Sequence, residues 1–202
     1  MSSFKSLPTM YTAIMTGEPY LYFEFRQVAK MRLAGLGPKE IRQKVYSENI
    51  FQYQTNKSIG RVLTAVLRRL DVLDDTLLEM CVNGSLATGR LIAVYTIAKT
   101  NLLFFEFLEE VYREKILLGN APLNREDLRI FFAQKRRQSK RVAGWSDETV
   151  VKLSQVYLKI LRDAGLITSE SPVTAPLVEQ PLIDYFTYIG EHRFLTAILG
   201  RV

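Results

Sequence analysis

The sequence predicts an almost entirely α-helical protein, with one short β-hairpin near its C-terminus. Apolar residues recur at helical spacing along nearly the whole chain, which is the primary sequence signal for helices. Recognisable residues for starting and ending helices flank these segments. Of the 202 residues, 48% are hydrophobic and 24% are charged, proportions that are typical of a globular protein with a real core.

Six helices are expected in an N-terminal helical bundle over residues 1–120. Glu18-Pro19 begins the first helix, because proline suits the first helical turn, and this helix runs to about Ala34. The others are expected over residues 39–46, 57–70, 74–82, 85–99 and 102–118. The last begins with Leu102-Leu103-Phe104-Phe105-Glu106-Phe107-Leu108, which is apolar on nearly all sides and predicts a central core helix. A strand is the alternative there, but the pattern continues helically to Leu118.

A C-terminal region over residues 121–202 follows the Gly-Asn-Ala-Pro boundary at 119–122. Asn124 is a good N-cap for a helix to Gln138, and Ser146-Asp147 caps a helix over residues 148–164 that ends at Gly165. Residues 166–168 and 173–178 resemble two strands joined by a turn, and two helical pieces are expected over 181–190 and 192–199. Helix, basic connector, helix and hairpin is the layout of a winged helix, in which the second helix enters the major groove of DNA.

The composition limits the possible functions. The net charge is +6, from 27 Lys+Arg against 21 Asp+Glu, which favours an acidic partner such as nucleic acid or an anionic lipid surface. Cys81 is the only cysteine and lies in an apolar stretch, so it is expected to be a buried hydrophobe. His192 is the only histidine and is expected to be a surface or partly packed residue, and no Cys/His zinc set, nucleophile elbow, P-loop or dinucleotide motif is present. We therefore expect no enzyme, no metal and no cofactor.

A membrane protein is not expected either. The most hydrophobic region, residues 91–108, is interrupted by Lys99 and Glu106, whose charges would fall near the bilayer centre. The first residues lack the apolar run of a secretory signal. The expected location is the cytoplasm.

Three basic segments carry the functional prediction. On the predicted helix 57–70, Lys57, Arg61, Thr64 and Arg68 share one face within about 60°. No acidic residue occurs between Glu48 and Asp71, so nothing nearby in the sequence neutralises this face. It suits contact with phosphates, although the solvated face of a core helix is an equally good interpretation.

The second segment is a dense basic run ahead of a capped helix, which favours phosphate contact over a merely solvated loop. Its cations are Lys135, Arg136, Arg137, Lys140 and Arg141. The third segment is the polar stripe of helix 148–164, formed by Lys152, Gln155, Lys159 and Arg162. Gln and Arg can read base edges while Lys suits phosphates, but Glu148 on the same face makes the stripe impure.

A series of short segments also forms a recognisable overall pattern from about Met10 to Ile167. They are Gly17-Glu18-Pro19, residues 24–30, Asn49-Ile50-Phe51-Gln52-Tyr53 before Lys57-Ser58-Ile59, Leu70-Asp71, Asn83-Gly84-Ser85, Phe104-Phe105-Glu106-Phe107, Phe131-Phe132, Trp145-Ser146 and Tyr157-Leu158-Lys159-Ile160-Leu161. Their order resembles the BrxA family of bacterial BREX phage-exclusion systems.

The resemblance implies a small, non-enzymatic, DNA-binding helical component of an anti-phage defence system, with other BREX proteins as partners and a fold related to NusB-type antitermination proteins. It supplies no DNA-contacting residues, so the candidate residues rest on the three basic segments.

The leading hypothesis is therefore binding of double-stranded DNA, with phosphates held by the cations named above and with Gln155 and Arg162 as the best candidates for base contact. The first alternative is an assembly adaptor whose aromatic residues, such as Phe51, Tyr53 and Tyr185, dock another defence protein. The second alternative is binding of RNA.

Overall fold

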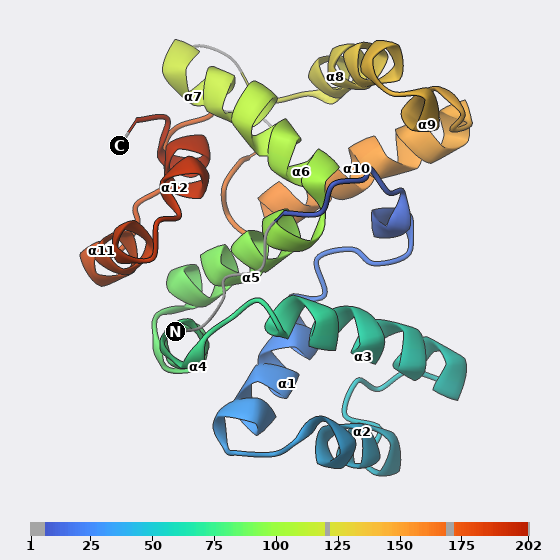
Figure 1. Cartoon of the computed structure of the whole chain (residues 1–202), viewed down its shortest axis with the longest axis vertical. Helices are drawn as coiled ribbons and strands as arrows, with labels where there is room; N and C mark the ends of the chain where they lie inside the picture. The colour runs from blue at the N-terminus through green and yellow to red at the C-terminus, as the bar shows by residue number, and fades with distance from the viewer. Residues whose placement is uncertain (1–6, 120–121, 169–171, 202) are drawn as a thin grey trace. The chain divides into compact units, whose positions relative to one another are not determined.

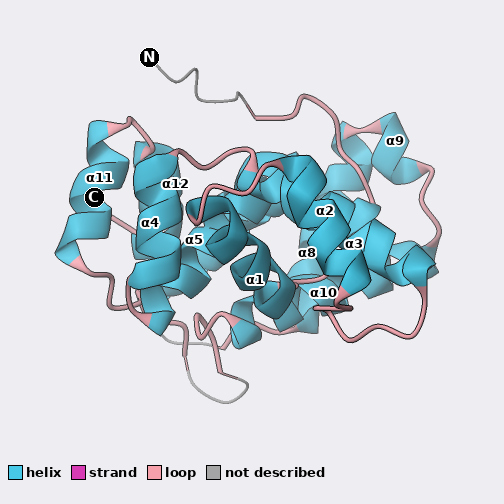
Figure 2. Cartoon of the chain, turned by 90° about the horizontal axis from the view of Figure 1, so that it is seen from below, coloured by secondary structure: helices cyan, strands magenta, loops and turns pink. Residues whose placement is uncertain are grey.

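A computed structural model of the chain describes residues 7–119, 122–168 and 172–201 (Figure 1). Every regular element within these residues is helical (Figure 2). The all-α class that the sequence predicts is confirmed. No single helix among the described residues has both the length and the apolar character needed to cross a membrane.

The described residues form two compact units. The first is Leu21–Thr100, and the second combines Leu7–Tyr20 with residues 101–201. The boundary predicted at residues 119–122 lies within the second unit and includes residues 120–121, which are outside the described residues. The division of the chain at residue 120 stays a prediction.

The first unit is built from the helices α1 (Tyr22–Leu33), α2 (Pro38–Ser47), α3 (Asn56–Leu70), α4 (Asp75–Asn83) and α5 (Leu86–Thr100). Helix α1 packs against α3, α4 and α5, and α2 packs against α1 and α3. Helix α3 begins where the Thr55 hydroxyl accepts a hydrogen bond from the Ser58 N–H. Its apolar face, with Ile59, Val62 and Val66, is buried, and the basic face therefore points outward.

The second unit is built around one long helical segment. This segment consists of α6 (Leu102–Phe107), a π-helical turn η2 (Leu108–Tyr112) and α7 (Arg113–Leu118). The other elements are η1 (Ile14–Thr16), α8 (Arg125–Gln138), α9 (Lys140–Ala143), α10 (Asp147–Asp163), α11 (Gln180–Tyr188) and α12 (His192–Leu199). Leu103, Phe104 and Phe107 are fully buried, which confirms the predicted core helix.

Aromatic rings fix α6, α8 and α10 against one another. The ring of Tyr157 on α10 lies 5.0 Å from Phe104 and 5.3 Å from Phe107, measured between centroids. On α8, Phe132 lies 6.0 Å from Tyr157 and Phe131 lies 5.7 Å from Phe107. Such pairs contribute specific geometry beyond the apolar area that they bury. Because the inner face of α10 is held in this cluster, its polar face is turned to solvent.

The predicted β-hairpin is wrong. Residues 166–168 and 172–178 contain no strand, and the predicted turn at 169–171 lies outside the described residues. Leu166, Ile167 and Val173 each bury their side chains, and the Leu166 carbonyl accepts a hydrogen bond from the Tyr112 hydroxyl at 3.3 Å. Pro176 has no N–H to donate to a strand ladder. Both segments thus bury apolar side chains without pairing as strands, and the described residues form no winged helix.

The basic run, residues 135–141, is helical at every position except Ser139. Helix α8 continues to Gln138, and α9 begins immediately after Ser139, whose hydroxyl accepts a hydrogen bond from the Val142 N–H at 3.4 Å. The basic run therefore has a helical phase, which decides the environment of each cation.

Candidate nucleic-acid interface

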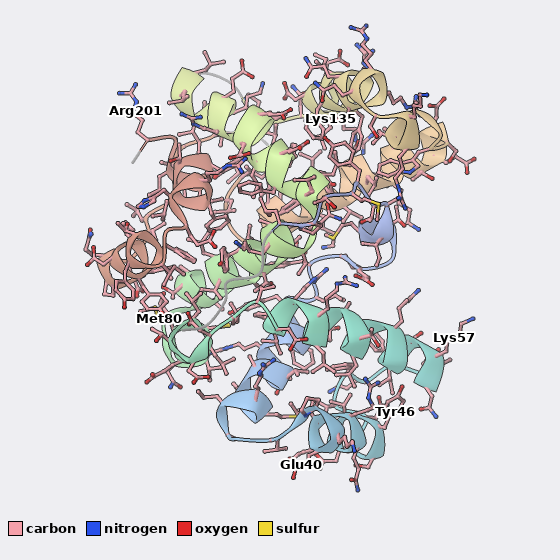
Figure 3. All side chains as sticks on the ribbon, viewed as in Figure 1. Glu40, Tyr46, Lys57, Met80, Lys135 and Arg201 are labelled. Carbon is pink, nitrogen blue, oxygen red and sulfur yellow. The ribbon has the colours of Figure 1, made fainter. Side chains whose placement is uncertain are left out.

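The α3 stripe, defined as Lys57, Arg61, Thr64 and Arg68, is exposed over most of its length. Lys57 and Arg61 are exposed and have no ion-pair partner among the described residues, whereas Arg68 is half-buried. Lys57 extends from the start of α3 into solvent (Figure 3). The Thr64 hydroxyl donates to the Gly60 carbonyl at 2.8 Å. The α3 stripe therefore presents two exposed cations, Lys57 and Arg61, that can meet an anion.

Lys135 is at the opposite extreme, because it is buried with only 2% of its surface exposed. Its Nζ atom lies 2.6 Å from Glu106 Oε2 and 2.6 Å from Glu110 Oε1. It also lies 5.2 Å from the centre of the Phe131 ring. The Tyr11 hydroxyl donates to Glu106 Oε2 at 2.8 Å. The side chains of Lys135, Glu106, Glu110 and Tyr11 form a polar cluster inside the second unit, so Lys135 is paired within the protein, and its contact with DNA stays a prediction.

Arg136 is half-buried and ties two helices together. One of its terminal nitrogens donates to Asp147 Oδ1 at 2.7 Å and to the Trp145 carbonyl at 3.0 Å. Asp147 is the first residue of α10, so this ion pair connects the end of α8 to the start of α10. Arg136 is already neutralised and is a poor phosphate ligand.

The remaining cations of the basic run are at the surface. Arg137, Lys140 and Arg141 are all exposed. Arg137 and Lys140 have no ion-pair partner in the part of the chain that the structure describes, and Arg141 Nη1 donates to the Met10 sulfur at 3.5 Å. The helical phase thus leaves one of the five neighbouring cations buried, one half-buried and three exposed.

The α10 stripe, defined as Lys152, Gln155, Lys159 and Arg162, is exposed as predicted. Lys159 Nζ pairs with Asp163 Oδ2 at 2.8 Å, whereas Lys152 and Arg162 have no such partner among the described residues. Glu148 is exposed near the start of the same face. The stripe therefore carries a small positive excess that is largest at Lys152 and Arg162.

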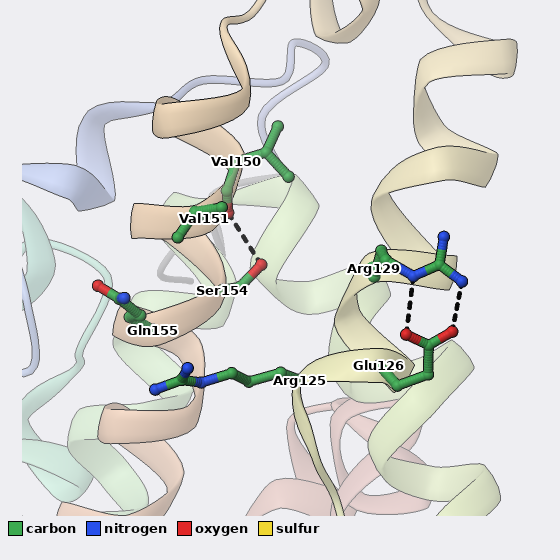
Figure 4. A pocket seen from close by; sticks show the side chains of 7 residues that line it. All are labelled: Arg125, Glu126, Arg129, Val150, Val151, Ser154 and Gln155. Atoms are coloured by element: carbon green, nitrogen blue, oxygen red, sulfur yellow. Dashed lines mark hydrogen bonds and ion pairs between the residues drawn. The ribbon is translucent and has the colours of Figure 1, made fainter.

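A pocket of about 240 Å³ lies between α8 and α10 (Figure 4). Val150, Val151 and Ser154 line it from α10, and Arg125 and Arg129 line it from α8. Gln155 belongs both to this pocket and to the α10 stripe. Arg125 and Arg129 are absent from the residues predicted from sequence, because only the packing of α8 beside α10 brings them to this site.

Two side chains singled out for their chemistry have the expected environments. Cys81 is buried, and burial raises the pKa of its thiol to about 12, so it stays protonated and inert near neutral pH. His192 is exposed at the start of α12.

The three aromatic residues predicted to anchor a protein partner, Phe51, Tyr53 and Tyr185, differ in their surroundings. Phe51 is buried, so it is not available to a partner. Tyr53 is half-buried and donates to Glu24 at 2.6 Å, and burial together with this hydrogen bond raises the pKa of Tyr53 to about 12. Tyr185 lies 6.1 Å, between ring centroids, from Tyr188, which is 84% exposed. Tyr188 is a surface aromatic that sequence reasoning missed, because a helix of nine residues does not reveal which face it buries.

Comparison with known proteins identifies the family. The BrxA family model matches residues 9–190. A Bacillus cereus protein named BREX protein BrxA is 34% identical over 195 residues, which cover 95% of this chain and 98% of the relative. A second protein of that name, from Paramagnetospirillum magneticum, is 26% identical over 78% of this chain and 79% of its own. The crystal structure of an uncharacterized protein from Magnetospirillum magneticum has the same fold, with a TM-score of 0.79, 22% identity and coverage of 94% of this chain and 98% of its own. The chain therefore belongs to the BrxA family of the BREX phage-defence systems.

Proposed function

We propose that this BrxA-family protein is a non-enzymatic component of its BREX system that binds double-stranded DNA, mainly through phosphates, and acts together with other BREX proteins. One observation supports the proposal above all. Six predicted residues are exposed cations that make neither an ion pair nor a side-chain hydrogen bond among the described residues: Lys57, Arg61, Arg137, Lys140, Lys152 and Arg162. A cation that is not already neutralised can replace the counterions condensed on DNA, which is the main source of affinity for a duplex.

The environments of the other predicted residues reduce the number of cations that are available to contact DNA. Lys135 and Arg136 hold carboxylates of the protein itself, and Lys159 shares its charge with Asp163. Base contacts, if the α10 stripe enters a groove, fall to Gln155 and Arg162, since their amide and guanidinium groups match base edges. Binding is therefore proposed to be mostly independent of DNA sequence.

The test is a fluorescence-anisotropy titration of a labelled DNA duplex at about 50 mM and about 200 mM salt. With six phosphate contacts, the affinity should fall about a thousandfold between these concentrations. The double variant Arg137→Glu/Lys140→Glu should weaken binding strongly, while Lys39→Glu, an exposed cation on α2, is the matched control and should change it little. Affinity that ignores salt, or no binding at the lower concentration, contradicts the proposal. An unlabelled RNA competitor in the same titration separates DNA binding from RNA binding.

A protein-binding adaptor is the second candidate, and the C-terminal helices favour it. Tyr188 on α11 is 84% exposed and Leu177, in the preceding loop, is 99% exposed. Exposed aromatic and apolar side chains of this kind can anchor a protein interface. The variant Tyr188→Ala should weaken co-purification with other BREX proteins and leave DNA affinity unchanged. The reverse pattern would assign Tyr188 to the DNA interface instead.

A further inference from the structure

We infer that the pocket between α8 and α10 receives one unpaired nucleobase, so that the protein prefers DNA containing an extrahelical base over a continuous duplex. The inference rests on the proposed function, because the same α10 stripe supplies the phosphate contacts. The exposed cations explain the binding of phosphates only. The pocket implies that the protein also recognises a flat aromatic base.

The size and walls of the pocket suit a base. Its volume of about 240 Å³ is below the roughly 300–1,000 Å³ of pockets that enclose drug-sized ligands, so it fits one small planar group. Val150 and Val151 form an apolar wall, and Val151 is 56% exposed to solvent. A base stacked on this wall would remove that apolar surface from water.

The polar residues of the pocket are the types that recognise bases. In Figure 4, the Arg125 side chain extends from the start of α8 across the pocket toward α10, beneath Gln155. Arg129 is held by Glu126 through a two-point ion pair, in which Arg129 Nε donates to Glu126 Oε2 at 2.7 Å. In Figure 4 this exposed pair lies on the side of α8 away from α10, so the planar group that can stack on an unpaired base in the pocket is the guanidinium of Arg125. The Gln155 amide can donate to and accept from a base edge.

The place of the pocket on α10 connects it to the proposed phosphate contacts. Gln155 lies one helical turn from both Lys152 and Lys159, since residues three and four apart are neighbours on a helix. A nucleotide whose base entered the pocket would have its backbone beside these lysines. An aliphatic side chain of a protein partner is a poorer match, because it would desolvate Arg125 and Gln155 without giving them hydrogen bonds.

The experiment compares three duplexes of one sequence in the same anisotropy titration. The first is continuous, the second carries one extra 2-aminopurine with no base opposite it, and the third carries an extra abasic nucleotide at that position. The protein should bind the second duplex about tenfold more tightly than the other two, as expected for one base stacked on protein side chains. The fluorescence of the 2-aminopurine should change on binding, because the base moves from the DNA stack into the pocket.

Two variants separate stacking from charge. Arg125→Lys keeps the positive charge but removes the planar group, so it should abolish the preference for the bulged base and leave affinity for the continuous duplex within about twofold. Lys152→Ala, outside the pocket, should weaken binding to all three duplexes equally. Equal affinity for the three duplexes, or equal affinity for the aminopurine and abasic bulges, overturns the pocket assignment while the proposed function stands. Failure to bind any duplex at low salt overturns both.

Discussion

The end of α8 and the outer face of α10 are both rich in lysine and arginine, yet they place these residues in opposite environments. Lys135 lies between Glu106 and Glu110 and is almost completely buried, whereas Lys152 and Arg162 are exposed and have no ion-pair partner among the described residues. The first two cations of the dense basic run, Lys135 and Arg136, are therefore less available to a polyanion than the exposed cations of α10. Helical phase and nearby carboxylates, rather than the local density of cations, decide which charges can meet a polyanion.

Among the variants that test this contrast, Lys135→Met is expected to cause the largest loss of stability. Removing a buried cation leaves Glu106 and Glu110 close together without compensation, and breaking such a cluster costs about 3 kcal/mol of the free energy of unfolding. Urea denaturation measures it, with Lys140→Met as the exposed control, which should change the free energy by less than about 0.5 kcal/mol. DNA affinity of the folded Lys135→Met protein should stay within about twofold of the original, because a buried lysine makes no phosphate contact. A stable variant that no longer binds DNA would reverse the roles assigned to the two regions.

The complementary change is Lys152→Glu/Arg162→Glu on α10. Reversing two exposed charges should lower affinity for a DNA duplex by about tenfold or more, and the slope of the logarithm of the binding constant against the logarithm of salt concentration should become shallower by about one for each phosphate that is no longer neutralised. The free energy of unfolding should hardly change, because neither side chain is packed in the core. Anisotropy titrations at several salt concentrations and a urea curve give both quantities. Unchanged affinity would move the DNA interface to another face.

The fold was predictable where local signals agree. The caps at Asn124 and Ser146 and the apolar faces of α3 and α10 place these helices close to their observed bounds. The hairpin was not predictable, because short apolar segments such as residues 173–178 look alike whether they pair as strands or pack singly against helices. Only the tertiary structure distinguishes these outcomes.

The candidate site was predictable in part, and Lys135 shows why. Leu128, Phe131, Phe132 and Lys135 follow the spacing of a single helix face, so the apolar face of α8 already contained the lysine in the sequence. Its partners Glu106 and Glu110 come from another helical segment, and no local pattern connects them to it. The pocket at Arg125 is also invisible in the sequence, because it exists only where α8 and α10 pack side by side.

A smaller loss of stability is expected from Tyr11→Phe, which removes one hydrogen bond from the cluster around Lys135. The destabilisation should be about 1 kcal/mol, since the bond is made to a charged group that is only partly buried. Burial and Glu106 raise the pKa of Tyr11 above its ordinary value of 10.0, so the folded protein holds this proton more tightly than the unfolded chain. Stability should therefore fall as pH rises above about 10, and fall less steeply in Tyr11→Phe. Identical alkaline denaturation curves would contradict the contribution of Tyr11.

Arg136→Ala is expected to change stability and DNA affinity least. It tests a half-buried cation, which is intermediate between the buried Lys135 and the exposed cations of α10. Arg136 is half-buried, but its partner Asp147 is largely exposed, and ion pairs of this kind contribute about 0.5 kcal/mol to stability. Removal of the hydrogen bond to the Trp145 carbonyl should be offset by water, which can reach this carbonyl once the side chain is truncated. Because Asp147 already neutralises Arg136, DNA affinity should fall by less than about threefold, and Asp147→Asn should raise it by releasing the cation. If Arg136→Ala instead weakens DNA binding as much as the double α10 variant, the Asp147 pair opens when DNA binds, and the boundary between internal and available cations lies at Lys135 alone.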